Sequence, residues 1–431
     1  MKPSISIITQ FYPPDYAATG QFVHDLACAL VKEGYSINVF TGMPSYAFKQ
    51  RDVDRQEYRN GVLVNRTGST EVMPRRIRGK LISSLLFWVR CAIKFRTKVA
   101  RGSHLIITTA PPFLGLIGWF YNKLCGHTYT CLIYDIYPEV AVRLNVVRRD
   151  EWIVKIWEAI NLRVWRRANS LVVLSEPMKQ LLIQRHRELA DKIHVIHSWA
   201  DNEFIKPLAK ERNWFIQEHG LTNAFIVLYS GNLGRCHDEI TLMQAARLLC
   251  DRPQIKFVFI GGGVGSHRIQ AAIDAGELPN TIKLPYQDHE VLPYSLTACD
   301  LSLVSLKANV EGVVAPSKLY GTLATGRPVA AICPPDSYIR QIIEQGNCGQ
   351  CFSNGDAQGL ADYIWMLSQN HSLQDYLGKN ARSYFEQNFT LEHAIPLYLK
   401  AIGLPQARPA NKSRLKRGGV DEMPTQPTLI D

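Results

Sequence analysis

Short apolar segments that alternate with helix-like segments recur along almost the whole chain, and this alternation restricts its fold more than any other feature. The first cycle starts with a β-rich run at residues 4–9, passes a loop that contains Gly20, continues as a helical pattern and returns to an extended run at residues 36–41. Helical patterns also separate the next β-rich runs, which lie at residues 105–109, 129–134, 170–174 and 194–196. Parallel strands need long crossover connections, which are usually helices, so the pattern predicts a doubly wound α/β domain.

The same cycle restarts in the second half of the chain. After the polar segment Asp201–Pro207, β-rich runs lie at residues 224–229, 256–260, 282–284, 301–304 and 329–332. A chain of 431 residues is also too long for one compact core. We therefore expect two domains, at residues 1–200 and 201–385. Periodicity is lost from Pro405, which predicts a disordered tail at residues 405–431.

The positive charge of the chain is concentrated in one segment. Lysine and arginine outnumber aspartate and glutamate by 49 to 38, which gives a net charge of +11. Between Glu71 and Asp135 there is no acidic residue. Within this stretch, residues 75–101 combine cations at helical spacing with aromatic and aliphatic residues, which is typical of a helix that lies on an anionic membrane surface. The alternatives are a core helix with a solvated cationic face and a nucleic-acid surface, but no nucleic-acid-binding motif is present.

The hydropathy of the chain bears on where it acts. No run approaches the roughly 18 to 20 uninterrupted apolar residues that span a bilayer. The N-terminus lacks the long apolar region of a secretory signal. We therefore expect a cytoplasmic protein that is peripheral on the inner face of the cytoplasmic membrane.

Glycine-containing turns follow the first strand of each expected domain. Gly20 follows the first, and Gly231 with Gly234 follows the other. In open α/β sheets, ligands bind beyond the carboxyl ends of the strands, where glycines let backbone N–H groups approach a diphosphate. Neither turn has the G-x-G-x-x-G pattern, which disfavours a dinucleotide. Two half-sites that face one cleft are the resulting expectation.

The most specific segment runs from Glu311 to Val329 and reads EGVVAPSKLYGTLATGRPV. It resembles family 4 retaining glycosyltransferases, in particular the bacterial polysaccharide and O-antigen enzymes with a Pro-Ser-Lys…Ala-x-Gly-x-Pro-Val helix. The resemblance covers about residues 4 to 402. It includes further motifs at residues 11–20 (FYPPD…TG), 135–139 (DIYPE), 229–234 (YSGNLG), 259–263 (FIGGG) and 388–392 (NFTLE).

This resemblance implies the GT-B architecture, in which two Rossmann-like doubly wound domains face a central cleft. It also implies retaining transfer of a sugar from a nucleoside-diphosphate-sugar to a saccharide or lipid-linked acceptor, with no cofactor and no essential metal. The C-terminal domain would bind the nucleotide-sugar and the N-terminal domain the acceptor. Residues 386–404 would form a helix that crosses back to the N-terminal domain.

The matching motifs also assign site residues. Donor-binding residues are expected at Gly20, Gly231, Asn232, Arg235, Gly262, Pro316, Ser317 and Lys318. Arg235 and Lys318 are the expected cations, because the leaving diphosphate gains negative charge. Tyr12 and Glu139 are expected on the acceptor side. Glu311 and Asp135 are the expected catalytic residues, Glu311 through hydroxyls of the donor sugar and Asp135 by orienting the acceptor or the transferred sugar. For Asp135, a helix cap ahead of Pro138 is the alternative.

The chain departs from the family pattern at several of these positions. The family usually has two glutamates eight residues apart, and alignment on Gly326 places them at Val313 and Gly321. Glu311 is expected to substitute for the first. The usual arginine and lysine of the C-terminal turn fall at Asn232 and near His237. These departures concern the contacts to the donor rather than the fold.

Two functions other than sugar transfer stay open. A nucleotide-sugar epimerase could use the same two-domain plan, and its turnover would need no acceptor. A catalytically silent nucleotide-sugar-binding subunit is compatible with the missing glutamate. A glycoside hydrolase would need two carboxylates beside one bond, and the diphosphate-binding turns would then have no purpose.

Overall fold

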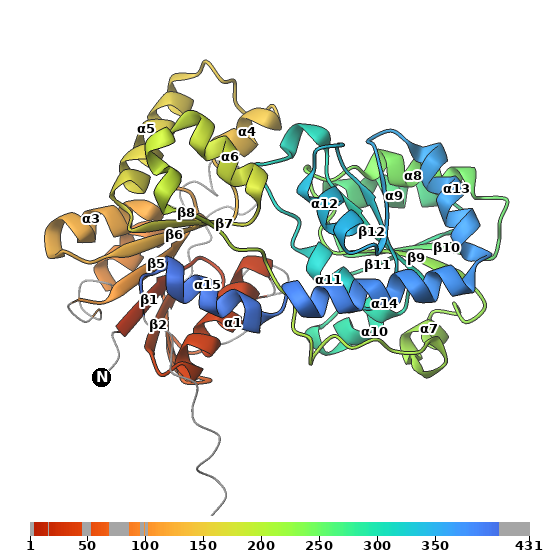
Figure 1. Ribbon diagram of the computed structural model, residues 1–431, viewed down its shortest axis with the longest axis horizontal. Coiled ribbons are helices and arrows are strands. Elements are labelled where there is room, and N and C mark those ends of the chain that lie inside the picture. The colour runs from red at the N-terminus through yellow and green to blue at the C-terminus, as the bar shows by residue number, and fades with distance from the viewer. Residues whose placement is uncertain are drawn as a thin grey trace, which may run out of the picture.

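The computed structural model describes residues 4–15, 17–44, 53–68, 86–94, 99 and 102–404. The described residues form two α/β units, each built on its own sheet (Figure 1). This is the GT-B-like architecture that the sequence predicts, with two Rossmann-like units facing each other. Most of residues 75–101 and the whole of residues 405–431 lie outside the described residues, so the structure does not test the predicted tail.

The first sheet contains eight strands in the described part of the chain, in the order β3-β4-β2-β1-β5-β6-β7-β8. Its strands are β1 (Ser4–Ile8), β2 (Ser36–Thr41), β3 (Gln56–Arg59), β4 (Val62–Arg66), β5 (His104–Thr108), β6 (Tyr129–Ile133), β7 (Ser170–Val173) and β8 (Ile193–Val195). Neighbouring strands are parallel except for the β3–β4 hairpin. β5 and β6 are buried along their whole length, as expected for parallel strands covered on both faces.

The second sheet is parallel throughout, with the order β11-β10-β9-β12-β13-β14 among the described residues. Its strands are β9 (Phe225–Ser230), β10 (Ile255–Ile260), β11 (Thr281–Leu284), β12 (Leu301–Ser305), β13 (Val329–Ile332) and β14 (Gly349–Phe352). The residue 200/201 boundary expected from the sequence falls between β8 and β9. All eleven strands that the sequence predicts are present, whereas β3, β4 and β14 were not predicted.

Helices connect the strands of both units. In the first unit they are α1 (Ala18–Lys32), α3 (Gly115–Cys125), α4 (Glu139–Arg143), α5 (Trp152–Arg167) and α6 (Glu176–Arg185), and residues 86–94 are also helical. The helices that follow are α7 (Trp214–Glu218), α8 (Glu239–Leu248), α9 (Val264–Asp274), α10 (Leu292–Thr297), α11 (Lys318–Ala324), α12 (Tyr338–Gln345), α13 (Ala357–Ser368), α14 (His371–Asn388) and α15 (Leu391–Ala401). Short 3-10 helices are η1 (Arg187–Lys192), η2 (Lys210–Arg212), η3 (His289–Val291) and η4 (Ala308–Val310). In the described part of the chain, no helix has both the length and the apolar character needed to cross a bilayer.

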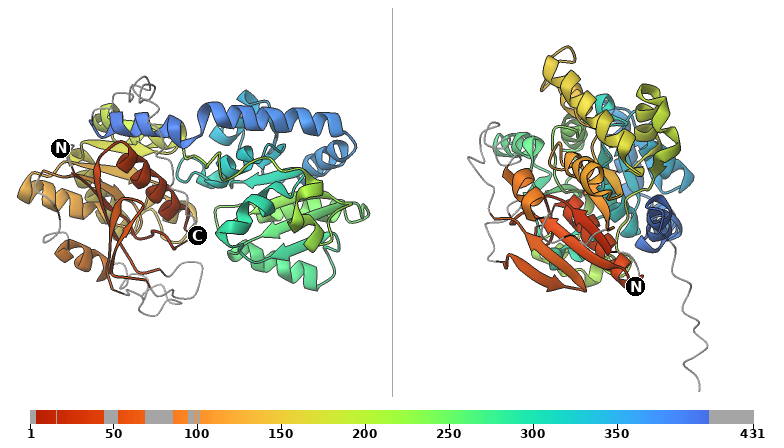
Figure 2. Two further views of the ribbon diagram at one scale, coloured as in Figure 1. Left: turned by 90° about the horizontal axis from the view of Figure 1, so that it is seen from below. Right: turned by 90° about the vertical axis from the view of Figure 1, so that its left-hand side faces the viewer.

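The last two helices join the units. α14 lies along the second unit against α11, and α15 lies on the first unit against α1 (Figures 1 and 2). The indole of Trp199 and the ring of Tyr398 in α15 are 5.9 Å apart, and the N–H of Ala200 donates to the carbonyl of Phe389. The chain therefore crosses between the units twice, at neighbouring places.

Candidate functional site

A large cavity lies between the two units. Its volume is about 700 Å³. The first unit contributes residues from the β1–α1 loop and from α1, and the second contributes the end of β9 and the start of α11. Both contributions come from the carboxyl ends of parallel strands, where α/β proteins bind their ligands. This interdomain cleft is the candidate site.

Lys318 links the two parts of the second unit that line the cleft. It is the first residue of α11, and its Nζ donates a hydrogen bond to the hydroxyl of Tyr229 at the end of β9. The same Nζ lies 3.7 Å from the centroid of the Tyr229 ring and 3.4 Å from the carbonyl oxygen of Asn232. Burial lowers the pKa of Lys318 well below its ordinary value. Of the predicted donor residues, Lys318, Gly231 and Asn232 are thus brought together, and Ser317 lines the same cleft.

The glycines beside Lys318 are needed for close approach of two turns. A Cβ on Gly261, where φ is +119°, would lie 2.4 Å from the carbonyl oxygen of Gly231. A Cβ on Gly263 would lie 2.4 Å from Oδ1 of Asn232. The predicted donor residue Gly262 lies between them, against the ring of Tyr286. The ends of β9 and β10 therefore form one glycine-rich surface next to Lys318.

Gly20, expected on the donor side, has a packing role in the structure. It lies in the first turn of α1 and its N–H already donates to the carbonyl of Ala17. An added Cβ would lie 3.0 Å from the carbonyl carbon of Phe11. Gly20 therefore lets α1 press against the β1–α1 loop, while its neighbours Ala18 and Gln21 line the cleft.

Asp25 and His24 of α1 line the cleft and were not found from the sequence. Burial raises the pKa of Asp25 to about 6, although the hydrogen bond from the Trp199 indole acts against this shift. Burial lowers the pKa of His24 to about 4, so its ring is neutral at pH 7. The helical pattern identified only the apolar face of α1, and nothing in it showed which polar positions would face a second unit.

Tyr12 was expected on the acceptor side, but the structure corrects this. It is only 2% exposed, and its hydroxyl forms a 2.9 Å hydrogen bond with Nδ1 of His24. Tyr12 therefore supports His24 from behind instead of facing a ligand. Pro316, an expected donor residue, is likewise buried.

Asp135 lies where the two units meet. Its backbone forms an antiparallel bridge with Val314, and the N–H of Ile136 donates to the carbonyl of Val313 at 3.0 Å. Burial raises the pKa of its carboxyl to about 6. Its side chain forms no hydrogen bond or ion pair with the described residues, so the expected capping alternative has no support here.

Glu139 was also expected on the acceptor side, and the structure shows it buried in an ion-pair cluster at the seam. It is 3% exposed and pairs with three guanidinium groups, those of Arg143, Arg149 and Arg185. Burial alone would raise its pKa, but these hydrogen bonds and charges hold the pKa below its usual range. Both carboxylate oxygens accept hydrogen bonds from these guanidinium groups, so Glu139 organises the three arginines.

Glu311 does not face the cleft in the way its expected catalytic role requires. Its Oε2 accepts a 2.6 Å hydrogen bond from the hydroxyl of Ser337, and its Oε1 is buried without a partner among the described residues. Val313, at the family's first glutamate position, is buried in the seam. Gly321, at the second, lines the cleft, and a Cβ there would meet only Ile205 at 3.9 Å. The space that the side chain of the family's second glutamate would occupy, beside Gly321, is therefore open.

Arg235, the second expected phosphate-binding cation, lines a different cavity from Lys318. That cavity has a volume of about 340 Å³ and shares no lining residue with the cleft. The sequence placed Arg235 correctly in the turn after β9, but not the direction of its side chain.

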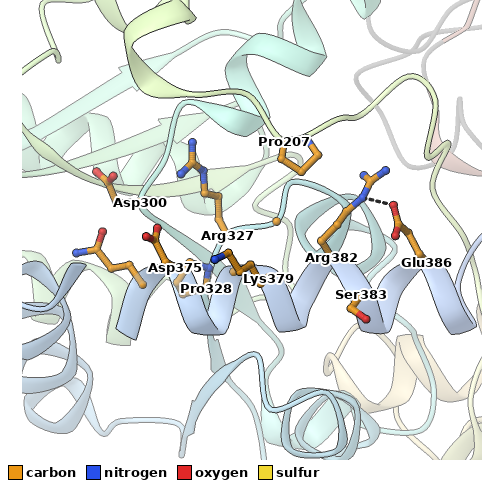
Figure 3. Close-up of a pocket in the computed structure, with 12 residues that line it drawn as sticks. Pro207, Asp300, Arg327, Pro328, Asp375, Lys379, Arg382, Ser383 and Glu386 are labelled. Carbon is orange, nitrogen blue, oxygen red and sulfur yellow. Dashed lines mark hydrogen bonds and ion pairs between the residues drawn. The ribbon is translucent and has the colours of Figure 1, made fainter. Parts of the chain in front are cut away.

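A further cavity of about 340 Å³ lies at the opposite end of the second sheet, before β12 and β13 and beside α14 (Figure 3). Three cations and three carboxylates line it: Arg327, Lys379, Arg382, Asp300, Asp375 and Glu386. Arg382 is already paired with Glu386 and Asp300 with Lys210. Its balanced charge and its distance from the carboxyl ends of the strands exclude it as the site of the predicted chemistry.

Sequence comparisons match both units to known protein families. Residues 18–199 match the glycosyl transferase 4-like domain, and residues 211–384 match the glycosyl transferases group 1. A probable glycosyltransferase, WbjE of Pseudomonas aeruginosa, is 25% identical over 74% of this chain and 79% of its own.

Two solved structures share the fold over 93% of this chain. Sucrose-phosphate synthase of Thermosynechococcus elongatus has a TM-score of 0.72 at 16% identity over 98% of its chain. HepE of Anabaena, in complex with UDP-glucose, has a TM-score of 0.69 at 15% identity over 99% of its chain. The two family matches together cover both units, one match for each. The chain therefore belongs to the family 4 glycosyltransferases with the GT-B fold, of the type that acts in polysaccharide biosynthesis.

Proposed function

We propose that this glycosyltransferase moves a sugar, with retention of configuration, from a nucleoside-diphosphate-sugar to a saccharide or lipid-linked acceptor. The observation that carries the proposal is the position of Lys318 against the glycine turn of β9 in the interdomain cleft. A cation and backbone N–H groups at that place suit a diphosphate leaving group. The solved complexes of HepE with UDP and with UDP-glucose, in the same fold, support a nucleotide-sugar donor.

The chain's own residues suggest how the transfer is assisted. Lys318 would neutralise charge that develops on the leaving diphosphate, which is the task a metal performs in other transferases. We therefore propose a metal-independent transfer of a hexose or a related sugar. The open space at Gly321 lies beside the cleft where a ribose or sugar hydroxyl would fit. Asp135, at the seam, is the proposed residue that orients the transferred sugar or the acceptor.

The proposal is tested by calorimetry with UDP and other nucleoside diphosphates, followed by assays of the nucleotide-sugar that binds. We expect nucleoside-diphosphate binding, slow hydrolysis of the donor without acceptor and faster turnover with an acceptor saccharide. Turnover to an isomeric nucleotide-sugar without any acceptor would instead show an epimerase. Binding of the nucleotide-sugar without hydrolysis, and without transfer to any acceptor, would show a catalytically silent binding subunit.

We also propose that the enzyme works on the inner face of the cytoplasmic membrane. The helical residues 86–94, α3 and α5 lie side by side, since the Tyr121 hydroxyl donates to the Ala92 carbonyl and Gly115 of α3 faces Val164 of α5. Exposed large apolar residues gather on these three segments: Val89, Ile93, Phe120, Leu124, Trp152, Ile153 and Ile156. Lys94, expected on the cationic face, is half-buried and donates to the carbonyl of Arg66, whereas Arg90, Lys123, Lys155 and Arg163 are exposed cations of these segments.

Sedimentation with lipid vesicles tests this surface. We expect binding to anionic phosphatidylglycerol vesicles that weakens with salt and with Trp152→Ser or Leu124→Ser. Trp214→Ser, which removes an exposed tryptophan of the other unit, is the matched control. Equal binding to neutral vesicles, or equal loss with the control, would contradict the proposal.

A further inference from the structure

A second interdomain cavity is lined by cations that the proposed transfer of the donor sugar does not use. Its volume is about 340 Å³. The first unit contributes the end of α4, and the second contributes the turn after β9, the starts of α8 and α9, and the segment after β12. Its charged lining residues are Arg143, Arg235, Arg268, Lys307 and Glu239.

The carboxylates near this cavity do not neutralise its cations. Glu239 is buried and pairs with Arg268 and, at 3.6 Å, with Lys307. Arg235 is exposed and forms no ion pair or hydrogen bond with the described residues. An exposed arginine is ordinary on a convex surface, but here it converges with other cations on one concavity.

The charge excess persists when the wider network is included. Arg143 pairs with the buried Glu139, which Arg149 and Arg185 also contact, and the last two share Glu158. Together with the cavity's own pairs, this gives six cations against three carboxylates. Like charges that face one hollow repel each other, and an anion placed between them relieves that repulsion.

The cavity also adjoins the seam where Asp135 lies. Nδ2 of Asn309 donates to the carbonyl of Arg143 at 2.7 Å, and Arg143 donates to the carbonyl of Glu311 at 2.6 Å. Cys236 follows Arg235 directly. Burial raises the pKa of the Cys236 thiol to about 11, and the nearby Asp135 carboxylate adds to this shift. The cavity at Arg235 therefore lies beside the seam at Asp135 and is separate from the donor cleft.

We infer that this cavity binds an oxyanion of the acceptor, a phosphate or a carboxylate, and so positions an acidic acceptor toward Asp135. The inference rests on the proposed function, in which the donor occupies the separate cleft at Lys318. Arg235 is the principal ligand of the oxyanion, with Arg143, Arg268 and Lys307 adding charge. The acceptor is thus a phosphorylated lipid carrier or an acidic sugar, and the two share one recognition chemistry.

The test uses the full chain saturated with UDP, so that the donor cleft is filled before an anion is added. Inorganic pyrophosphate and glucuronate are then titrated separately by calorimetry at constant ionic strength. We expect one of them to bind, and Arg235→Ala to weaken that binding about tenfold or more, because one charge-assisted contact is lost. Arg235→Lys should restore part of the affinity, and Arg235→Glu should abolish it.

The control is Arg212→Ala, since Arg212 is an exposed arginine of the same unit that lines no described cavity and has no described partner. Binding of pyrophosphate alone would indicate a phosphate-bearing acceptor, and binding of glucuronate alone an acidic sugar. The inference is overturned if neither binds, if the anion displaces UDP, or if Arg235→Ala and Arg212→Ala behave alike. Absence of UDP binding in the initial titration with UDP would instead refute the donor site. This result does not depend on the anion titrations.

Discussion

At the scale of single residues, Lys318 carries a charge that its surroundings do not balance. Its Nζ contacts the face and the hydroxyl of Tyr229 and the carbonyl of Asn232, but no described carboxylate pairs with it. A cation over an aromatic face is stabilised, yet its loss of hydration still favours the neutral amine, which is why its pKa is lowered. A diphosphate would supply the missing opposite charge.

Nucleotide binding should therefore take up a proton at Lys318. Because burial lowers the pKa of Lys318 and an arriving diphosphate raises it again, the proton uptake on binding should increase as the pH is raised. Calorimetry in two buffers of different ionisation enthalpy measures this uptake. We expect Lys318→Met to abolish it and to weaken UDP by about 2 kcal/mol, or roughly thirtyfold. Lys379→Met, on exposed α14, is the control, and equal proton uptake in wild type and Lys318→Met would refute the prediction.

Asp135 should make stability depend on pH. Its folded-state pKa of about 6 lies above the ordinary value, so the folded chain holds the proton more tightly than the unfolded chain. The contribution is therefore fully present below about pH 4 and is lost as the pH rises through 6. Asp135→Asn should make the protein more stable than wild type at pH 8, by up to about 3 kcal/mol, and no more stable at pH 4.

Urea unfolding at both pH values measures this difference. Asp375→Asn, an exposed aspartate without a described partner, should change stability equally and little at both. A gain at pH 8 that persists at pH 4 would show that removal of a charge at Asp135 is not its cause. Asp25, whose pKa is also about 6, accepts a hydrogen bond from Trp199, so its amide variant would alter a contact as well as a charge.

At the scale of elements, the sequence was informative where burial sets the pattern. Parallel strands covered on both faces are apolar runs, and each such run predicted a strand. The β3–β4 hairpin was missed because β3 is mostly exposed and polar, although its Asn60-Gly61 turn, with both residues at positive φ, is a known hairpin signal. β14 was missed because it is short and begins at Gly349, where a Cβ would lie 1.8 Å from the carbonyl oxygen of Val329.

The candidate site was predictable only as far as local motifs determine it. The turn after β9 and the start of α11 were identified, because glycines and a Pro-Ser-Lys segment mark them in the sequence. The partners of Glu139 lie up to 46 residues away, in Arg185, so no local pattern shows that its carboxylate is engaged. The direction of Arg235 and the exposure of Asp25 depend on how two separate units meet.

The glycine turns give a prediction at this scale. Gly263 has φ +106° and ψ 173°, a conformation that other residues avoid, and its Cβ would lie 2.5 Å from the carbonyl oxygen of Leu233. Gly263→Ala should therefore lower the free energy of unfolding by about 3 kcal/mol and also weaken UDP binding, because the adjacent turn must shift. Gly276→Ala is the matched control, since Gly276 has φ +75° with nothing within 4 Å. It should cost only about 1 to 2 kcal/mol and leave UDP binding intact; equal effects of the two variants would contradict the prediction.

At the scale of the whole molecule, the cleft exists because two units are held at a fixed separation. The seam at Asp135 and Val314 and the hydrogen bond from Arg143 to Glu311 hold one side. The segment after β8 and the α14–α15 junction hold the other, where Arg382 is central (Figure 3). Interfaces between the domains of one chain ordinarily permit relative motion. The residues that hold both crossings together therefore determine how far the two sides of the cleft can separate.

Arg382 should therefore matter more than a surface arginine. Its guanidinium donates to the carbonyls of Ile205 and Ala324 at 2.7 Å and of Asn202 at 3.0 Å, and it pairs with Glu386. Arg382→Met should cost about 3 kcal/mol of unfolding free energy, because three carbonyls lose a charged donor. It should also raise hydrogen exchange at the amide of Ile205, which now bonds to the Asp201 carbonyl. Arg382→Lys should not restore either property, since an ammonium cannot reach several carbonyls in a planar fork.

Arg247→Met, which removes one exposed ion pair with Glu277, is the control and should cost less than about 1 kcal/mol. If Arg382→Met matches that control in urea unfolding and in exchange at Ile205, the crossing is held by apolar packing between α15 and α1 and not by this arginine.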